Sequence, residues 1–221
     1  MPDYIKKLIA EGEHQMLDFK FEVSDSRKIA RAMVAFANTD GGRLLIGVKD
    51  NGSIAGVRTE EEFYMVEGAS RLYCKPEIGI KIRQWNVEGK TILEVIVQPG
   101  GEKPYRAMDE KGRWRAYLRQ RDENFQASRV SCLVWEREKS GAGTFLNFGH
   151  AERLLLKHLG SHPWITLAGF RRIAGITRER AEDILANFIM LKILDTEYIE
   201  QDIIYRLRPG SEKVFEGLDR S

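Results

Sequence analysis

Cysteine is scarce in this sequence: its 221 residues include two, Cys74 and Cys132. They form no C-x-x-C pair, and neither has a histidine beside it. Zinc sites and disulfide frameworks depend on such spacings, so the sequence predicts neither of them. A small secreted protein held together by disulfides is therefore excluded, and a reducing compartment is the expected environment.

Long apolar runs are missing as well. The first residues, MPDYIKKLIAEGE, lack the apolar segment of a signal peptide. No later run approaches the length of about 20 residues that a membrane-spanning helix needs. We therefore predict a cytoplasmic protein without a membrane partner.

Neither sign of charge is in large excess. The chain has 35 Lys and Arg residues against 33 Asp and Glu residues, a net charge of +2. Overall charge therefore does not indicate a nucleic-acid partner, and any binding surface must come from local clusters of cations. A hydrophobic content of 43% is typical of a globular chain, long enough here for one large domain or two.

The P-loop pattern G-x-x-x-x-G-K-[ST] is absent too. Glycine-rich turns at residues 38–42 and 50–52 are present, but neither opens a helix directed at a phosphate. ATP hydrolysis is therefore not expected, and turn and hairpin geometry account for these glycines.

The most strongly patterned stretch runs from residue 29 to residue 57. It begins with apolar residues at helical spacing: Ile29, Ala32, Met33 and Phe36. Asn and Gly residues at 38–42 predict the end of this helix, and the apolar run at 44–48 predicts a buried central strand. Asn51-Gly52 is typical of a hairpin, with 53–57 as its returning strand.

Patterns on either side predict further elements. These are a helix over 4–10, a strand over 17–23, a helix over 59–72 that begins at Thr59 with Glu62 in a capping box, a hairpin of strands at 78–82 and 92–97, a strand over 113–119 and a closing helix over 122–138.

Four of these segments resemble the Schlafen-type AlbA_2 domain, also described as a divergent AAA-4 or DNA-binding domain. They are Glu13–Lys20 (EHQMLDFK), similar to the family's E-x-x-x-x-E-F-K opening, the NTDGG-to-NGSIAG stretch, Lys103-Pro104-Tyr105, and Ala116–Arg119 (AYLR). The resemblance covers residues 1–138 and implies an α+β fold, a mixed sheet with helices, that binds nucleic acid.

The pattern changes after the glycine-rich residues 139–143, which predict a domain boundary. Helices over 151–159 and 166–173, a third helix that Thr177 caps, and a hairpin over 198–207 resemble a winged helix-turn-helix domain. We therefore predict an AlbA_2-like domain at 1–140, a small winged-helix domain at 145–210 and a tail at 211–221.

A first candidate site consists of Glu13, Asp18, Lys20 and Asp50, which can converge if the strands that carry Asp18 and Asp50 are neighbours. Carboxylates are hard-oxygen ligands suited to Mg²⁺ or Mn²⁺, and a lysine stabilises charge on a phosphate. Resemblance to Schlafen RNases implies that Glu13, Asp18 and Asp50 are metal ligands of a nuclease. The chain departs from that pattern, because Asp18 replaces a glutamate and the second lobe and zinc ligands are missing. Surface salt bridges are the alternative reading.

Residues 102–121 form a second candidate, a basic segment that includes aromatic side chains. Cations beside aromatic rings suit phosphate contacts and base stacking. A charged, solvated edge strand is the alternative. The predicted nucleic-acid-binding residues here are Lys103, Tyr105, Arg106, Arg113, Arg115, Arg119 and Arg121.

The third candidate lies in the predicted winged helix, where Arg171 and Arg172 end one helix and Arg178 and Arg180 begin the next. A helix-turn-helix contacts DNA at this place. Acidic neighbours interrupt the patch, and dimerisation or packing is the alternative use of such a domain.

The sequence therefore favours a two-domain nucleic-acid-binding protein, a transcriptional regulator that needs no cofactor. The alternatives are a metal-dependent endoribonuclease using Mg²⁺ or Mn²⁺, and an interaction module whose winged helix dimerises. Enzymatic activity is left open, with the balance against it. The expected partners are DNA or structured RNA and a second copy of the chain.

Overall fold

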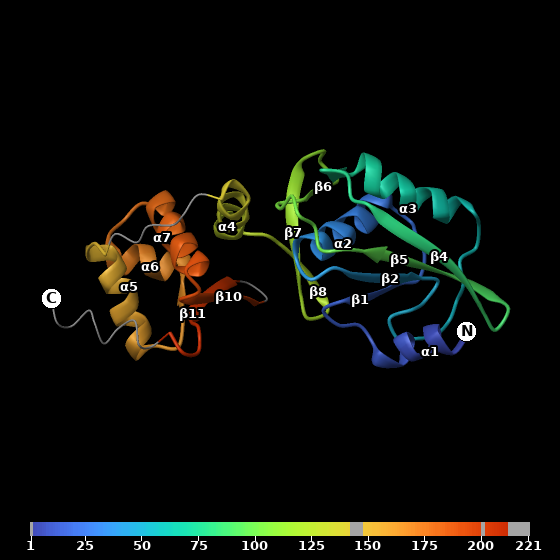
Figure 1. Cartoon of the computed structure of the whole chain (residues 1–221), viewed down its shortest axis with the longest axis horizontal. Coiled ribbons are helices and arrows are strands. Elements are labelled where there is room, and N and C mark those ends of the chain that lie inside the picture. Colours follow the sequence, from blue (N-terminus) through green and yellow to red (C-terminus); the bar gives the residue numbers. More distant parts are fainter. Residues whose placement is uncertain (1, 142–147, 200–201, 212–221) are drawn as a thin grey trace. The chain divides into compact units, whose positions relative to one another are not determined.

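The computed structural model describes residues 2–141, 148–199 and 202–211. The chain divides into two compact units, Met1–Ala127 and Ser128–Ser221 (Figure 1). The predicted tail at 211–221 lies outside the described residues except for Ser211, and so do residues 200–201 of the predicted hairpin.

The first sheet of the first unit has the strand order β1-β2-β5-β4. Its members are β1 (Leu17–Lys20), β2 (Gly42–Ile46), β5 (Lys90–Val97) and β4 (Ile80–Val87). β1 runs parallel to β2, while the β2–β5 and β5–β4 pairs are antiparallel. The sheet is therefore mixed, and β1 lies at its edge next to the central strand that the apolar run at 44–48 predicts.

Helices cover both faces of this sheet (Figure 1). α1 (Pro2–Glu11) packs on one face, where Ile5 and Leu8 join Leu45 of β2 in an apolar cluster. α2 (Ser26–Asn38) packs on the other, against Leu44 of β2. Side chains alternate across a strand, so one short apolar strand contributes to two cores.

A second sheet packs on α2 and has the strand order β3-β6-β7-β8. Its strands are β3 (Cys74–Lys75), β6 (Arg106–Met108), β7 (Trp114–Gln120) and β8 (Glu123–Gln126), preceded in the chain by α3 (Glu61–Leu72). The α2 core cluster includes Ala107 of this sheet beside Leu44 and Val95 of the first. α2 is thus the element around which the unit is assembled.

The local sequence explains where α2 begins and ends. The Asp25 side chain accepts a hydrogen bond from the Arg27 N–H and caps the helix, and Thr39 follows its last residue. Gly41 has a φ of 74°, which favours glycine. A Cβ at Gly42 would collide with the Phe36 ring, so the glycine allows the chain to turn closely against the helix it has just left.

Four predictions for this unit are wrong in part. The helix expected to begin at Thr59 begins at Glu61, after Glu60, whose side chain makes no capping hydrogen bond. The strand expected over 17–23 ends at Lys20. Residues 53–57 form no regular strand: Val48 and Ile54 make an isolated bridge, and the Val57 N–H donates to Thr91 O of β5. Residues 123–126 are strand β8 and not helix, because they pair with β7 and place Phe125 opposite Leu118. The predicted helix begins at Arg129, where the Ser128 side chain caps it.

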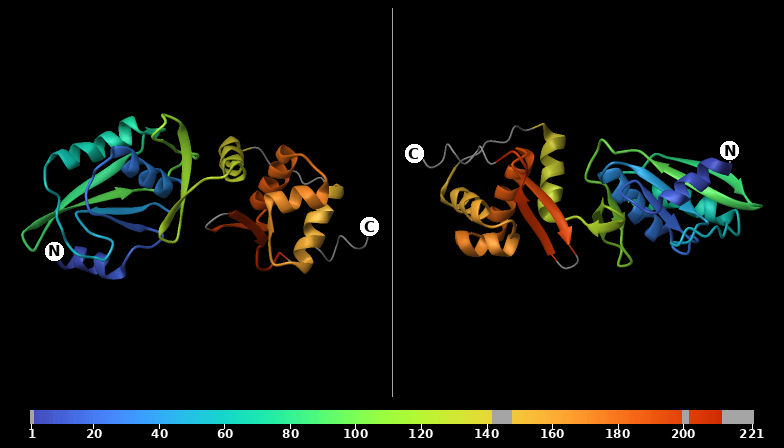
Figure 2. Two further views of the ribbon diagram at one scale, coloured as in Figure 1. Left: turned by 180° about the vertical axis from the view of Figure 1, so that it is seen from behind. Right: turned by 90° about the horizontal axis from the view of Figure 1, so that it is seen from below.

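The second unit begins with α4 (Arg129–Ser140) and contains α5 (His150–Ser161), β9 (Ile165–Thr166), α6 (Leu167–Ala174), α7 (Arg178–Met190), β10 (Leu194–Ile199) and β11 (Asp202–Leu207), which Figure 2 shows from two further sides. The three strands form an antiparallel sheet in the order β10-β11-β9. The side chains of Thr166 and Thr177 cap α6 and α7. The sequence predicts the cap at Thr177.

The structure divides the chain earlier than residues 139–143, of which 142–143 lie outside the described part. Val130 and Val134 of α4 belong to the same apolar cluster as Leu155 and Phe188. Burial of its apolar face therefore places α4 in the second unit. Within the described residues, no helix is both long enough and apolar enough to span a bilayer.

Candidate functional site

β1 places Asp18 at the centre of a cluster of charged side chains. Asp18 is buried, with 3% of its surface exposed. Lys20 Nζ lies 2.9 Å from its Oδ2 and Arg119 Nη2 lies 3.6 Å from its Oδ1. The contact with Lys20 lacks hydrogen-bond geometry, so Oδ2 is a buried oxygen without a hydrogen-bond donor among the described residues.

Glu13 completes the cluster. Its Oε1 accepts a hydrogen bond from the Phe19 N–H at 2.8 Å. Burial, followed by a hydrogen bond with the Asp18 carboxyl group, raises the pKa of Glu13 to about 7. Near neutral pH a large share of the Glu13 carboxyl groups therefore carries a proton.

Arg119 is a structural residue and not a nucleic-acid contact. Its side chain is fully buried, with 0% of its surface exposed. Nε donates to His14 O, Nη2 to Leu17 O and Nη1 to Asn124 Oδ1, at 3.0, 2.9 and 3.2 Å. The guanidinium also stacks over the Phe36 ring at 5.0 Å. The prediction that Arg119 binds phosphate is therefore wrong, because β7 turns this residue towards α2 and β1.

Asp50 does not join Glu13 and Asp18. In the parallel register Asp18 pairs with Leu44, whereas Asp50 is exposed in the turn beyond the end of β2. Among the residues that the structure describes, no three His, Cys, Asp or Glu side chains are placed to hold a metal ion. The predicted set of three carboxylate ligands is therefore not assembled.

The structure separates the residues of the predicted basic segment. Tyr105 is buried, and its backbone pairs with the Asn38 side chain. Lys103 Nζ donates to Thr39 O at 3.3 Å, and the Arg121 N–H donates to Gln15 Oε1 at 2.7 Å. Lys103 and Arg106 are half-buried, and Arg121 is exposed in the turn after β7.

Arg113 and Arg115 remain at the surface. Both reach Asp109, with Nε–Oδ2 distances of 2.9 and 3.7 Å, and their side chains are 55% and 36% exposed. Asp109 also accepts hydrogen bonds from the N–H groups of Lys111 and Arg113. This carboxylate therefore organises the β6–β7 turn and holds the two arginines beside it.

Sequence reasoning missed three cations on α2: Arg27, Lys28 and Arg31. They lie on the polar side of the helix, and Lys28 and Arg31 are exposed. Arg31 lies over the Tyr117 ring of β7 at 5.9 Å. The signal was present in the sequence, because S-R-K-x-x-R repeats a cation at helical spacing opposite the apolar stripe.

The four arginines predicted to contact DNA in the second unit fall into two pairs. Arg178 Nε contacts Glu182 Oε1, and Arg180 Nη2 contacts Glu152 Oε1, each at 2.8 Å. Both glutamates are buried. Arg171 and Arg172 are exposed on α6, and no ion pair joins either side chain to another described residue.

α4 packs along one side of α7. Arg137 of α4 contacts Asp183 Oδ1 at 2.5 Å and Asn187 Oδ1 at 2.7 Å. Asp183 and Asn187 are half-buried and flank the core residues Ile184 and Phe188 of α7. The middle of α7 is therefore covered, whereas its first turn is exposed.

Comparison with known proteins identifies the first unit. Residues 13–128 match the family described as Schlafen, AlbA_2. The chain belongs to this family. The match begins at Glu13, includes the Asp18 cluster and ends where the first unit ends, and membership in the AlbA_2 family points to an association with nucleic acid. No curated protein matches the chain.

Two solved structures are similar to the chain. The DIP2311 protein from Corynebacterium diphtheriae shares 19% identity at a TM-score of 0.47, over 86% of this chain and 36% of that protein. The N-terminal domain of a protein from Nitrosomonas europaea, described as related to the ATP-dependent DNA helicase RecG, shares 24% identity at a TM-score of 0.40. That match covers 49% of this chain and 80% of the domain. The chain therefore spans about a third of the length of the Corynebacterium protein.

Proposed function

We propose that this AlbA_2 protein binds DNA and acts as a transcriptional regulator, with both units contacting the duplex. The family supports an association with nucleic acid for the first unit. The proposal for the second unit depends on the order of its elements and on its exposed arginines.

The observation that carries the proposal is the succession α5, β9, α6, α7, β10 and β11. α6 and α7 are joined by a short turn in which Gly175 has a φ of 63°. The β10–β11 hairpin follows directly, in the position of a wing. This is the element order of a winged helix-turn-helix, in which the second motif helix enters the major groove with its first residues.

The exposed cations fit this docking. Arg171 and Arg172 lie at the end of α6, and Arg178 and Arg180 lie in the first turn of α7. Because α4 covers Asp183 and Asn187, only the first turn of α7 can approach base edges. We infer that binding depends mainly on phosphate contacts, which position a protein on DNA and make affinity depend on salt.

A binding titration of the full chain tests this function. The affinity for a labelled duplex and for RNA hairpins of the same charge is measured at two salt concentrations. The proposal predicts binding to the duplex at low salt that weakens steeply as salt rises. Absence of binding to any duplex at low salt would refute it. Binding to RNA hairpins alone would transfer the function from DNA to structured RNA.

An endoribonuclease is the second candidate, and the buried carboxylate pair is the observation in its favour. The donor set nevertheless fits Mg²⁺ or Mn²⁺ poorly. The raised pKa leaves Glu13 partly protonated near neutral pH, Lys20 and Arg119 already neutralise Asp18, and Asp50 lies elsewhere. A hard cation seeks several ionised oxygen ligands, so binding without cleavage is the better supported function.

A further proposal concerns assembly. A regulator that binds two half-sites is two-fold symmetric, and the exposed apolar residues Leu191 and Ile199 of the second unit offer surface for a partner. We propose that the chain binds DNA as a homodimer.

A further inference from the structure

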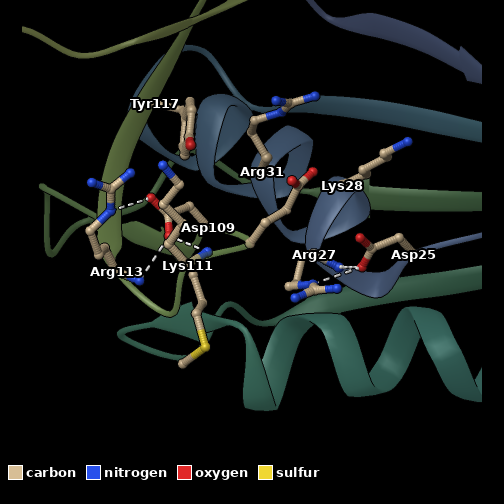
Figure 3. A pocket seen from close by; sticks show the side chains of 10 residues that line it. Asp25, Arg27, Lys28, Arg31, Asp109, Lys111, Arg113 and Tyr117 are labelled. Atoms are coloured by element: carbon tan, nitrogen blue, oxygen red, sulfur yellow. Dashed lines mark hydrogen bonds and ion pairs between the residues drawn. The ribbon is translucent and has the colours of Figure 1, made fainter.

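A cavity of about 230 Å³ lies between α2 and the β6–β7 turn (Figure 3). Arg27, Lys28 and Arg31 reach it from α2, and Lys111 and Arg113 reach it from the turn. Tyr117 of β7 lies beside Arg31 at one end, as Figure 3 shows. Helix α2 and the β6–β7 turn, which are far apart in the sequence, therefore both place cationic side chains around this cavity.

The charges around this cavity do not balance. Five cationic side chains line it, against the three acids Asp25, Asp109 and Glu110, which leaves an excess of two positive charges. Asp25 caps α2 and Asp109 accepts hydrogen bonds from the N–H groups of Lys111 and Arg113, so both acids are already engaged. Hydrogen bonds from the Arg113 backbone, above all, hold the pKa of Asp109 below its usual value.

We propose that this cavity binds a phosphate monoester, and that the monoester is the phosphorylated end of a nucleic-acid strand. The second part rests on the nucleic-acid binding proposed above. A monoester carries about −1.5 to −2 charge at neutral pH, which matches the excess of two positive charges, whereas a backbone diester carries one negative charge. Arg and Lys donors form short, charge-assisted hydrogen bonds with such an anion.

The size of the cavity favours a terminal group. Pockets that enclose a whole small ligand are typically about 300–1,000 Å³, so this cavity holds a phosphate group and part of a sugar. A phosphate inside a nucleic-acid strand carries a nucleoside on each side, whereas a terminal phosphate carries one. A terminal phosphate therefore fits more easily into a small cavity. The Tyr117 ring and the Arg31 guanidinium offer flat faces on which the terminal base stacks, which distinguishes a nucleic acid from a phosphopeptide.

Lys28 and Arg31 are the residues to replace. Both are exposed on α2, and alanine is a better helix former than either, so the double variant Lys28→Ala/Arg31→Ala keeps the fold. The cap at Asp25 is untouched. The matched control is Lys81→Ala/Arg83→Ala, which removes two exposed cations from β4. Glu110→Gln removes the third acid of the cavity.

The experiment compares one short single strand with a 5′-phosphate, a 3′-phosphate or hydroxyl ends, titrated into the full chain at low salt. We expect one phosphorylated strand to bind about tenfold more tightly than the hydroxyl strand, a difference of about 1.4 kcal/mol. The Lys28→Ala/Arg31→Ala variant loses this preference, the control keeps it and Glu110→Gln increases it.

Three results overturn the inference: equal affinity for all three strands, a preference that persists in Lys28→Ala/Arg31→Ala, or a phosphoserine peptide that binds as tightly through the same two residues. Equal binding of the three strands leaves the proposed function intact. If none of the strands and no duplex binds, both proposals fail.

Discussion

Asn38 and Tyr105 join α2 to the second sheet of the first unit. Asn38 Nδ2 donates to Tyr105 O at 2.9 Å and to Tyr117 O at 2.7 Å, and the Tyr105 N–H donates to Asn38 Oδ1 at 2.8 Å. One buried amide thus satisfies three backbone groups on two different segments. The helix end that the NTDGG sequence forms is therefore also the attachment point of the segment that contains Lys103-Pro104-Tyr105.

Replacing this amide should destabilise the first unit. Asn38→Ala leaves three buried backbone groups without partners, and each such loss costs about 1–3 kcal/mol before relaxation and water entry. We expect the free energy of unfolding of the first unit to fall by about 3 kcal/mol. Native-state hydrogen exchange measures each unit separately. Asn86→Ala, at an exposed position of β4, is the control, and an equal effect of both substitutions would contradict the role of Asn38.

The Glu13–Asp18 pair predicts a dependence of stability on pH. The folded-state pKa of Glu13 is raised from 4.5 to about 7, so the native state binds more protons than the unfolded state between these values. Stability should therefore fall as pH rises from about 4.5 to 7. Glu13 is partly solvated, which screens the interaction, and we expect a loss on the order of 1 kcal/mol.

Glu13→Gln tests the same pair. The amide can still accept from the Phe19 N–H and donate to Asp18, so it reproduces the protonated state at every pH. The variant should lose the fall in stability between pH 4.5 and 7 and be more stable than the native chain at pH 8. Urea titrations at several pH values measure both effects. An unchanged slope in the variant would show that other groups cause the dependence.

Glu13 and Asp18 also allow a test that distinguishes RNA binding from RNA cleavage. We expect structured RNA to stay intact when it is incubated with the protein and Mg²⁺ or Mn²⁺, because the Asp18 carboxylate is already paired with Lys20 and Arg119. Gel analysis of end-labelled RNA decides this. EDTA-sensitive cleavage that Asp18→Asn abolishes, while binding persists, would make the nuclease the better account.

The proposed homodimer has a direct test. Light scattering at micromolar concentration should give twice the mass of the 25.4 kDa chain. Leu191→Lys/Ile199→Lys, which places charge on two exposed apolar positions, should give the monomer and weaken DNA binding. A native chain that is monomeric in solution and on DNA would remove this part of the proposal.

Local patterns were sufficient to predict the framework of the first unit. The stripe from Ile29 to Phe36, the glycines at 41–42 and the apolar run at 44–48 each have one low-energy structure, so α2 and β2 follow from them. Strand β8 did not follow, because residues 123–126 become strand only through long-range pairing with β7. The secondary-structure propensity of residues 123–126 alone cannot predict this pairing, because strand formation depends on the neighbouring strand.

The candidate site was less predictable, because it depends on which way side chains point. The alternation from Arg113 to Arg119 correctly indicates a strand, but it does not show that the face carrying Arg119 is turned towards α2. The proximity of Glu13 to Asp18 follows from local chain geometry, whereas the position of Asp50 depends on the register between β1 and β2. Arg27, Lys28 and Arg31 were not predicted as a site, because the apolar stripe of α2 indicates only a helix with one buried face. It does not show that the polar face lies beside the β6–β7 turn.

The central claim is that the second unit holds DNA through the arginines of α6. Arg171→Ala/Arg172→Ala removes two exposed cations, and Arg153→Ala/Lys157→Ala removes the same charge from the exposed side of α5. Duplex affinity of both variants, measured across a salt series, is the direct test. The account predicts that only the α6 variant loses about tenfold in affinity at low salt, and that its slope of log affinity against log salt falls by about 2. Equal losses in the two variants, or an unchanged slope in the α6 variant, would contradict it.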